Sequence, residues 1–388
     1  VGEDQGALAE GGRGDRFDVF DDDALGDQRR RQKDGDAGSP RAICRHAADA
    51  VDGHVIRLDG GAGVEDGEAC TAAVLDHETA QGRGRPILDQ DALAAEPIRR
   101  AARDIPDDDV REAELAAVVG ELGLPVAVIG RGSNLLVADT GFPGVAVQLG
   151  PAFDVTEMLA DDEVRIAGAA SLPVVARQLT AAGRLGFEWA VGVPGSLGGA
   201  VRMNAGGHGS DMAASVRVAT VVDLASGQTE EVEASALSFS YRSSSVRAHQ
   251  VVVDALLQLG EGDPAVGQAL LSEIVRWRRA NQPGGQNAGS VFTNPADDSA
   301  GRLIDASGLK GLRIGSAHVS TKHANFIQAD PGGTAADIVA LMQEVIRRVH
   351  ADHGVVLHAE TRMIGFGPEE TALMFDPEDR DDHREEQR

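Results

Sequence analysis

A glycine-rich stretch at residues 192–209 places the strongest constraint on how this chain can fold. It reads Gly-Val-Pro-Gly-Ser-Leu-Gly-Gly-Ala and continues Val-Arg-Met-Asn-Ala-Gly-Gly-His-Gly. Few packed helices or strands tolerate so many glycines, so a flexible loop is one reading. Flexible loops seldom contain apolar residues such as Val193, Leu197 and Met203. The second reading is therefore a packed loop whose backbone closely approaches a flat or anionic ligand, and the stretch alone leaves both readings open.

A second glycine motif follows residues 126–129, an apolar run that is typical of a buried strand. Residues 130–134 read Gly-Arg-Gly-Ser-Asn, in which the glycines allow a sharp turn and let backbone N–H groups point at an anion. An ordinary turn after a strand is the more common meaning of such a motif. It is not a Walker phosphate-binding loop, because no Lys-Ser or Lys-Thr pair follows it.

The charge balance of the 388 residues limits the partners of the chain. A net charge of −26 repels nucleic acid and anionic membranes, so neither is expected, and an anionic small ligand needs a local basic pocket. No apolar run is long enough to span a membrane and no secretory signal opens the chain, which predicts a cytoplasmic protein. The two cysteines, Cys44 and Cys70, lie outside every motif used here, so neither a disulfide scaffold nor a metal site is expected.

The two ends of the chain differ in character from its middle. Residues 1–95 contain charge runs and many glycines without a sustained hydrophobic period, which predicts a mostly disordered segment. The first methionine is Met158, and we hypothesise that Val1 is not the biological start. At the other end, residues 368–388 are expected to form a solvated acidic tail.

Hydrophobic periods between these ends predict two parts of mixed α and β structure. For the first part we expect a helix at 112–122, strands at 126–129, 145–149, 164–167, 216–222 and 251–257, and a helix at 171–185. For the second part we expect a helix that ends before Pro283, strands around Val291 and at 324–327, and a closing strand at 355–364. A long helix begins after Thr334, with Asp337 completing a capping box and Gly354 ending the helix.

Three polar segments are candidates for a site, although each has an ordinary structural explanation. Residues 241–244 read Tyr-Arg-Ser-Ser, and an arginine in such a place is usually part of a surface ion pair. Residues 289–295 read Gly-Ser-Val-Phe-Thr-Asn-Pro, which by itself most often means a strand followed by a turn. Glu360, within His-Ala-Glu-Thr-Arg at 358–362, can equally be a strand residue that faces solvent.

Taken in order, these segments resemble the UDP-N-acetylenolpyruvoylglucosamine reductase family, also called UDP-N-acetylmuramate dehydrogenases. Three further motifs support the resemblance: Ala-Gly-Arg-Leu-Ile-Asp at 300–305, Gly-Leu-Lys-Gly at 308–311 and His-Ala-Asn-Phe-Ile at 323–327. The resemblance to this family covers residues from about 112 to 365. The resemblance implies an α+β fold, with a two-part FAD-binding domain of the PCMH type at 96–260 and a smaller α+β substrate-binding domain at 261–367. The strand and turn that normally open the flavin domain are missing before Ile105.

The resemblance also implies a reaction and a set of residues. In this family NADPH reduces FAD, and the reduced flavin passes hydride to the vinyl ether of UDP-N-acetylenolpyruvoylglucosamine. Arg242 is expected to stabilise the negative charge that develops on the substrate, Glu360 to act as a protonated hydrogen-bond donor, and Ser290 to give a proton to carbon. The predicted substrate-binding residues are Tyr241, Arg278, Asn294 and His323. The predicted cofactor-binding residues are Gly130, Gly132, Ser133, Asn134, Gly192, Pro194, Gly195, Ser196, Gly198, Gly199, Asn204 and Gly206.

Two other functions remain open at this point. One is a different FAD-dependent oxidoreductase of the same fold that acts on an alcohol or a sugar. The segments around Ser290 and Glu360 disfavour it, because they match the substrate domain of the reductase family. The other is a non-catalytic protein without flavin that binds UDP-sugars, a possibility raised by the missing opening strand. We expect a monomer with a small-molecule substrate.

Overall fold

The computed structural model describes residues 54–60, 70–75 and 124–375, and for the first two stretches it describes the backbone only. The helix expected at residues 112–122 lies outside these ranges. None of the helices in the described ranges is long and apolar enough to cross a membrane.

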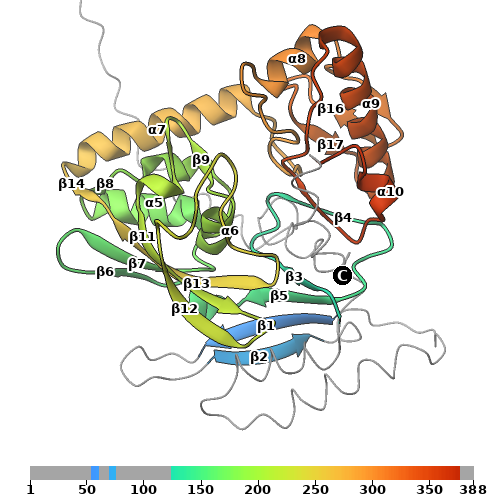
Figure 1. The fold of residues 1–388 in the computed structure, drawn as a ribbon. Helices are drawn as coiled ribbons and strands as arrows, with labels where there is room; N and C mark the ends of the chain where they lie inside the picture. Colours follow the sequence, from blue (N-terminus) through green and yellow to red (C-terminus); the bar gives the residue numbers. More distant parts are fainter. Residues whose placement is uncertain (1–53, 61–69, 76–123, 376–388) are drawn as a thin grey trace, which may run out of the picture. The chain divides into compact units, whose positions relative to one another are not determined.

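A four-stranded sheet contains the strand that precedes the glycine motif at residues 130–134 (Figure 1). Its order is β2 (Cys70–Leu75), β1 (His54–Gly60), β5 (Val145–Leu149) and β3 (Val126–Val128). Strands β1 and β3 both run parallel to β5, whereas β2 is antiparallel to β1. The strands expected near residues 126 and 145 are thus present. Strands β1 and β2 were not expected, because residues 1–95 show no hydrophobic period of the kind that announces a strand.

The largest core lies on a five-stranded antiparallel sheet. Its order is β12 (Gln228–Glu233), β11 (Val216–Asp223), β13 (Gln250–Gln258), β7 (Glu163–Ala167) and β6 (Thr156–Met158). Helices α5 (Leu172–Ala181) and α6 (Leu197–Arg202) and the 3-10 helix η4 (Glu188–Gly192) contribute buried residues to the same core. Strands β7, β11 and β13 were predicted from the sequence, whereas β6 and β12 were not. Short elements complete this part: η3 (Pro151–Phe153), β8 (Arg184–Leu185), β9 (Gly206–Gly207), β10 (Ser210–Asp211), η5 (Met212–Ala214) and β14 (Gly260–Glu261).

Helix α7 (Pro264–Asn281) packs differently from what the sequence suggested. Its buried side chains Leu271 and Ile274 belong to the core of the five-stranded sheet, and the helix contacts α5 and η4. The expected boundary near residue 261 therefore separates α7 from the part on which it packs. The apolar period of a helix shows that one face is buried, but it does not tell which neighbour covers that face.

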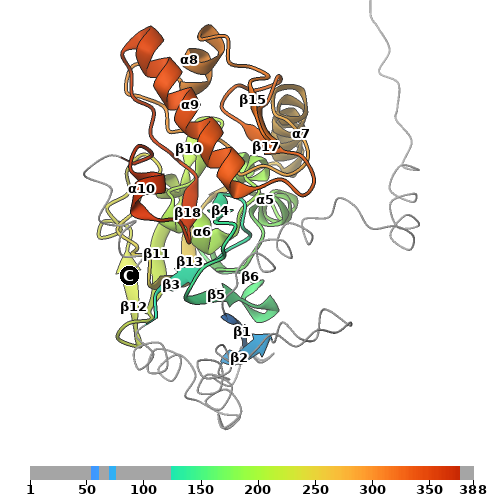
Figure 2. The same cartoon turned by 90° about the vertical axis from the view of Figure 1, so that its right-hand side faces the viewer.

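A second core lies in the C-terminal part, where α9 (Ala335–His353) and α8 (Ala300–Ala306) pack with a small sheet (Figure 2). The sheet has the order β15 (Arg313–Ile314), β16 (Ala317–Val319) and β17 (Ile327–Ala329). Helix α9 begins after Thr334, whose hydroxyl accepts the N–H of Asp337 at 3.2 Å, and ends at Gly354 with a left-handed φ of 71°. Only half of the expected capping box forms, because the Asp337 carboxylate accepts hydrogen bonds from Ser316.

Two expected strands of this part are shorter than predicted. Around Val291 there is only an isolated bridge between Phe292 and Ala359, and the closing strand β18 covers Arg362–Ile364. Strand β18 pairs in parallel with β4 (Leu135–Val137), which follows the glycine motif at residues 130–134. The tail also begins later than expected: after α10 (Pro368–Thr371), Met374 and Phe375 are buried in the C-terminal core. Their apolar side chains outweigh the acidic composition around them.

Candidate active site

The two glycine motifs face each other, and we call residues 130–134 and 192–199 together the glycine cradle. A Cβ atom on Gly130 would lie 2.6 Å from Ser196 Oγ, a distance that real Cβ atoms do not reach. A Cβ atom on Gly195 would lie 3.6 Å from Ser133 Oγ, so the loops also approach each other there. Gly132 has a left-handed φ of 67°, which favours glycine. Residues 192–199 are therefore packed rather than a flexible loop, and Leu197 to Gly199 begin helix α6.

Other glycines of the stretch at residues 192–209 are required by packing inside the protein. A Cβ atom on Gly198 would lie 2.8 Å from the carbonyl oxygen of Val252 on β13. A Cβ atom on Gly206 would lie 2.6 Å from the Cβ atom of Asp211 on the paired strand β10. These two positions explain their glycines without a ligand.

Arg242 lies in a tight turn that its own backbone geometry marks as strained. Ser240 and Ser243 exchange both backbone hydrogen bonds across the turn, at 3.0 and 3.3 Å. Arg242 has a left-handed φ of 58°, which a residue with a side chain adopts at a cost of order 1 kcal/mol or more. Such strain persists only where surrounding contacts hold it, and the side chain of Asn204 supplies one by donating to the Ser240 carbonyl at 2.8 Å.

The turn directs Arg242 to Glu360, on the segment just before β18. The Nε atom of Arg242 lies 2.9 Å from Oε1 of Glu360, and the two side chains are 26% and 14% exposed. Burial raises the pKa of Glu360, and the nearby positive charge of Arg242 offsets part of this effect. The guanidinium also lies 5.2 Å from the centre of the Tyr241 ring. A carboxyl group is thus held in a protein-lined site beside one fixed cation.

Ser290 lies on the segment next to Glu360. The carbonyl of Val291 accepts the N–H of Glu360 at 2.8 Å, so the residue after Ser290 is paired directly with the backbone of Glu360. Gly289 has a left-handed φ of 76°, and a Cβ atom on it would lie 3.9 Å from the carbonyl oxygen of Ser133. The segment that carries Ser290 therefore runs between the glycine cradle and the segment of Glu360. Arg242 contacts this segment through its ion pair with Glu360.

The four residues predicted to bind the substrate fall into two groups. Tyr241 and Asn294 contact each other, whereas Arg278 and His323 have lowered pKa values. The Asn294 amide donates to the Tyr241 hydroxyl at 3.3 Å, which joins the turn of Arg242 to the C-terminal part. The Arg278 guanidinium donates to the carbonyl of Gly192, and burial lowers its pKa. Burial, with the neighbouring charge of Lys310, also lowers the pKa of His323. The lowered pKa favours the uncharged form of His323 at neutral pH.

Known proteins share both the sequence and the fold of this chain. The family profiles described as FAD binding domain and UDP-N-acetylenolpyruvoylglucosamine reductase, C-terminal domain, match residues 106–233 and 281–364. The UDP-N-acetylenolpyruvoylglucosamine reductase of Heliobacterium modesticaldum is 43% identical over 264 residues, which are 67% of this chain and 83% of the relative. The chain belongs to this reductase family. The relative of the same name from Gloeobacter violaceus is 43% identical over 251 residues, 63% of this chain and 83% of the relative.

The crystal structure of UDP-N-acetylenolpyruvylglucosamine reductase from Thermus caldophilus matches the chain with a TM-score of 0.57 and 33% identity. The match covers 65% of this chain and 89% of that protein. It confirms the predicted α+β fold, in which an FAD-binding domain precedes the C-terminal domain of the reductase family. The family assignment makes the chain an oxidoreductase of the flavoprotein type.

The glycine cradle is compatible with the FAD-binding domain to which it belongs, because its glycines leave the backbone of both segments uncovered by side chains. At Gly130 a side chain is excluded by Ser196 of the opposite segment, so the two segments approach each other closely. Two amides expected to bind cofactor have partners within the protein. The side chain of Asn134 donates to the Glu360 carbonyl at 3.0 Å, and that of Asn204 donates to the Ser240 carbonyl.

Three residues next to the site were not expected from the sequence. Asn325 is 4% exposed and bonds to both backbone groups of Phe292. Gln148 of β5 donates to the Gly130 carbonyl at 3.0 Å, and Asp139 accepts two N–H groups at the start of α9. Asn325 lies in a motif that supported the family resemblance, but nothing in a single sequence tells which backbone group an asparagine binds.

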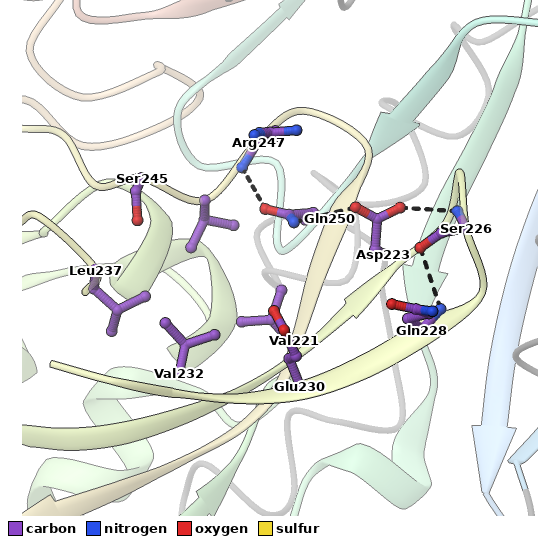
Figure 3. A pocket seen from close by; sticks show the side chains of 11 residues that line it. Val221, Asp223, Ser226, Gln228, Glu230, Val232, Leu237, Ser245, Arg247 and Gln250 are labelled. Carbon is purple, nitrogen blue, oxygen red and sulfur yellow. Dashed lines mark hydrogen bonds between the residues drawn. The ribbon is translucent and has the colours of Figure 1, made fainter.

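A pocket elsewhere on the five-stranded sheet contains none of these residues. Figure 3 shows its lining side chains, which come from β11, β12, β13 and the segment before β13 and include Asp223, Glu230 and Gln250. No group of histidine, cysteine and carboxylate side chains within residues 124–375 has the arrangement of a metal site. The candidate site is therefore the region of Arg242, Ser290, Glu360 and the glycine cradle.

Proposed function

We propose that this chain reduces UDP-N-acetylenolpyruvoylglucosamine to UDP-N-acetylmuramate with NADPH as the electron donor and FAD as the cofactor. The observation that carries the proposal is the partly buried pair of Arg242 and Glu360, with Ser290 on the adjacent segment. The names of the relatives at 43% identity supply the substrate class. A monomer is sufficient for the reaction, because the described residues of one chain supply all three groups.

When bound in the glycine cradle, FAD would supply the hydride-transfer chemistry that links NADPH to the substrate. The glycine cradle supplies the close backbone approach that such a ligand needs, with Ser133 and Ser196 as side-chain donors. Gly192 at the end of η4, Pro194 after it and Gly199 in α6 belong to the same glycine cradle and to the expected cofactor set. This assignment leaves Asn134 and Asn204 to contribute through their backbone, because their side chains bond elsewhere.

Arg242 and Glu360 stabilise the charge that develops beside the substrate carboxylate after hydride arrives. A guanidinium offers a planar pair of donors that matches a carboxylate, and its charge does not depend on pH in the working range. Because burial raises the pKa of Glu360, its protonated form is favoured relative to a solvated carboxyl and can donate a hydrogen bond. Both groups are fixed before the reaction, which is what stabilises a transition state more than the ground state.

Ser290 completes the reaction by giving a proton to carbon. In this step the O–H bond of Ser290 breaks and a C–H bond forms at the carbanion next to the substrate carboxylate. Solvent then returns a proton to the serine oxygen. A carbanion is basic enough to take a proton from a neutral hydroxyl, so no activating histidine is needed. Tyr241, Asn294, Arg278 and His323 are assigned to binding the sugar nucleotide.

Anaerobic stopped-flow absorbance of the purified chain tests this function. We expect bound flavin that NADPH reduces and that UDP-N-acetylenolpyruvoylglucosamine reoxidises, with NADH slower in the first step. Flavin that is reduced but is reoxidised only by another alcohol- or sugar-derived acceptor would replace the proposal by a different oxidoreductase. A chain that neither retains flavin nor takes up added FAD would support a non-catalytic sugar-nucleotide-binding protein.

A further inference from the structure

In each of the three segments that carry a reacting group, the backbone is hydrogen-bonded to the side-chain amide of an asparagine. Asn325 bonds to Phe292, two residues after Ser290. Asn204 bonds to Ser240, at the start of the Arg242 turn, and Asn134 bonds to the carbonyl of Glu360 itself. None of these three segments is part of a regular ladder at the reacting residue, so side-chain amides do there what strand pairing does elsewhere.

Asn325 shows the arrangement most clearly. Its Nδ2 donates to the Phe292 carbonyl at 2.8 Å and its Oδ1 accepts the Phe292 N–H at 3.0 Å, while its backbone carbonyl accepts the N–H of Val291 at 3.0 Å. One residue thus fixes three backbone groups of Val291 and Phe292, the two residues directly after Ser290. The side chain is buried, and a buried amide whose donor and acceptor are both used cannot be exchanged for water contacts without loss.

Asn204 holds the turn of Arg242 in a comparable way. It is 4% exposed, donates to the Ser240 carbonyl at 2.8 Å and accepts the N–H of Ala213 at 3.0 Å. The turn needs such support, because Arg242 has the left-handed φ noted above. Asn134 has a third arrangement: its side chain donates to the Glu360 carbonyl, and its own carbonyl accepts the N–H of Arg362 at 3.1 Å.

We propose that Asn325, Asn204 and Asn134 are positioning residues, which set the places of Ser290, Arg242 and Glu360 respectively. The inference rests on the proposed function, because it assigns these three groups to one reaction. It differs from the cofactor-binding role expected for Asn134 and Asn204. Small displacements of reacting groups cost large factors in rate, so the loss of one amide bond affects the step that uses the attached group.

Asn325→Asp is the decisive variant, because it keeps the size of the side chain and, when the acid is ionised, replaces the donor to Phe292 by a charged oxygen that cannot donate. At pH 8 we expect reoxidation of reduced flavin by UDP-N-acetylenolpyruvoylglucosamine to slow by about 10- to 100-fold. Reduction by NADPH is expected to stay within about twofold, since it does not use Ser290. As the pH falls, the protonated acid regains a donor, and the ratio of variant to wild-type reoxidation rates should rise.

Gln250→Glu is the matched control. Gln250 also accepts a backbone N–H, from Arg247 at 2.9 Å, and its amide donates to Asp223 at 3.2 Å in the pocket of Figure 3. Exchange of this amide for an acid is expected to leave both half-reactions and their pH dependence unchanged. Equal slowing of both half-reactions in Asn325→Asp, or wild-type reoxidation at pH 8, would overturn the inference.

Asn134→Ala keeps the inference testable if Asn325→Asp does not fold, because Asn134 is only partly buried. A positioning role predicts normal flavin content and normal reduction by NADPH, with slower reoxidation by substrate. If the side chain of Asn134 instead binds the cofactor, Asn134→Ala should lose flavin and slow both half-reactions. That result would contradict the proposal. Failure of the proposed function itself is recognised separately, because the wild-type chain would then not be reoxidised by this substrate.

Discussion

The Nε atom of Arg242 lies 2.9 Å from Oε1 of Glu360, and this contact joins a strained turn after β12 to the segment before β18. Both side chains are largely withdrawn from solvent. An isolated surface pair contributes about 0–1 kcal/mol to stability and does not require a left-handed arginine. The strain at Arg242 and the burial of Glu360 are therefore better explained by a site than by stabilisation of the fold.

Charge substitutions at this pair separate the roles of its two members. Glu360→Gln keeps the length of the side chain and a hydrogen-bond donor, so we expect it to retain much more activity than Glu360→Asp, which moves the group by about one bond length. Arg242→Lys is expected to lose most turnover, because an ammonium group cannot reproduce the planar two-point contact with a carboxylate.

Steady-state rates of the three variants, with bound flavin measured in each, check this prediction. If both residues merely formed a surface ion pair, all three substitutions would change turnover little and stability by about 1 kcal/mol or less. Near-wild-type turnover in Arg242→Lys would contradict the assignment of Arg242. Higher activity in Glu360→Asp than in Glu360→Gln would contradict the protonated role of Glu360.

Ser290→Ala should affect one half-reaction only. The variant lacks the hydroxyl that gives a proton to carbon, so we expect reoxidation of flavin by substrate to slow by several orders of magnitude while reduction by NADPH stays nearly intact. Stopped-flow absorbance resolves the two steps. Equal slowing of both would remove Ser290 from proton transfer and indicate a defect in folding or flavin binding.

The sequence predicted much of the fold because several elements announce themselves locally. Helix α9 has a long apolar stripe, a capping threonine and a terminal glycine, and it begins and ends where these residues place it. The strands near residues 126, 145, 164, 216 and 251 also follow from apolar runs. The site residues were found through ordered motifs and not through any physical signal in a single segment.

What the sequence could not predict depends on contacts between distant residues. The neighbours of α7, the burial of Met374 and the bonds of Asn325 to Phe292 are all set by tertiary packing. Burial also lowers the pKa of His323, and the sequence does not show which residues bury it. Apolar periodicity identifies a buried face, and a polar residue identifies a possible donor, but neither identifies the partner.

The raised pKa of Glu360 predicts a pH dependence of stability. Burial is the main cause of the shift from the usual value of 4.5, so the protonated form is favoured in the folded state. Its contribution to stability is fully present below the unfolded pKa and is lost as the pH rises through the folded pKa. Glu360→Gln does not titrate. We therefore expect the free energy of unfolding of wild type, relative to Glu360→Gln, to decrease as the pH is raised above about 4.5.

Urea unfolding of both proteins across this pH range measures the difference directly. The comparison uses matched pH values, so titration of all other groups cancels to first order. Two curves that stay parallel would show that the pKa of Glu360 is the same in the folded and unfolded states. Stability of wild type that rises relative to Glu360→Gln with increasing pH would show that Arg242 outweighs burial.

Asp139 offers a last test, because it joins the loop after β4 to the start of α9. Its carboxylate accepts the N–H of Ala335 at 2.7 Å and that of Ala336 at 3.0 Å, two groups that have no partner within the helix. Asp139→Ala should lower the free energy of unfolding by about 1 kcal/mol, the usual effect of losing a capping side chain. Asp263→Ala is the matched control, since Asp263 caps α7 by accepting the N–H of Ala265 at 2.9 Å. Strand β4 follows Asn134 and pairs with β18, so only Asp139 links its cap to the segment of Glu360. We therefore expect similar stability losses in the two variants, but a severalfold slower reoxidation of flavin by substrate in Asp139→Ala alone. Equal reoxidation rates at matched flavin content would show that the cap stabilises α9 without positioning the site.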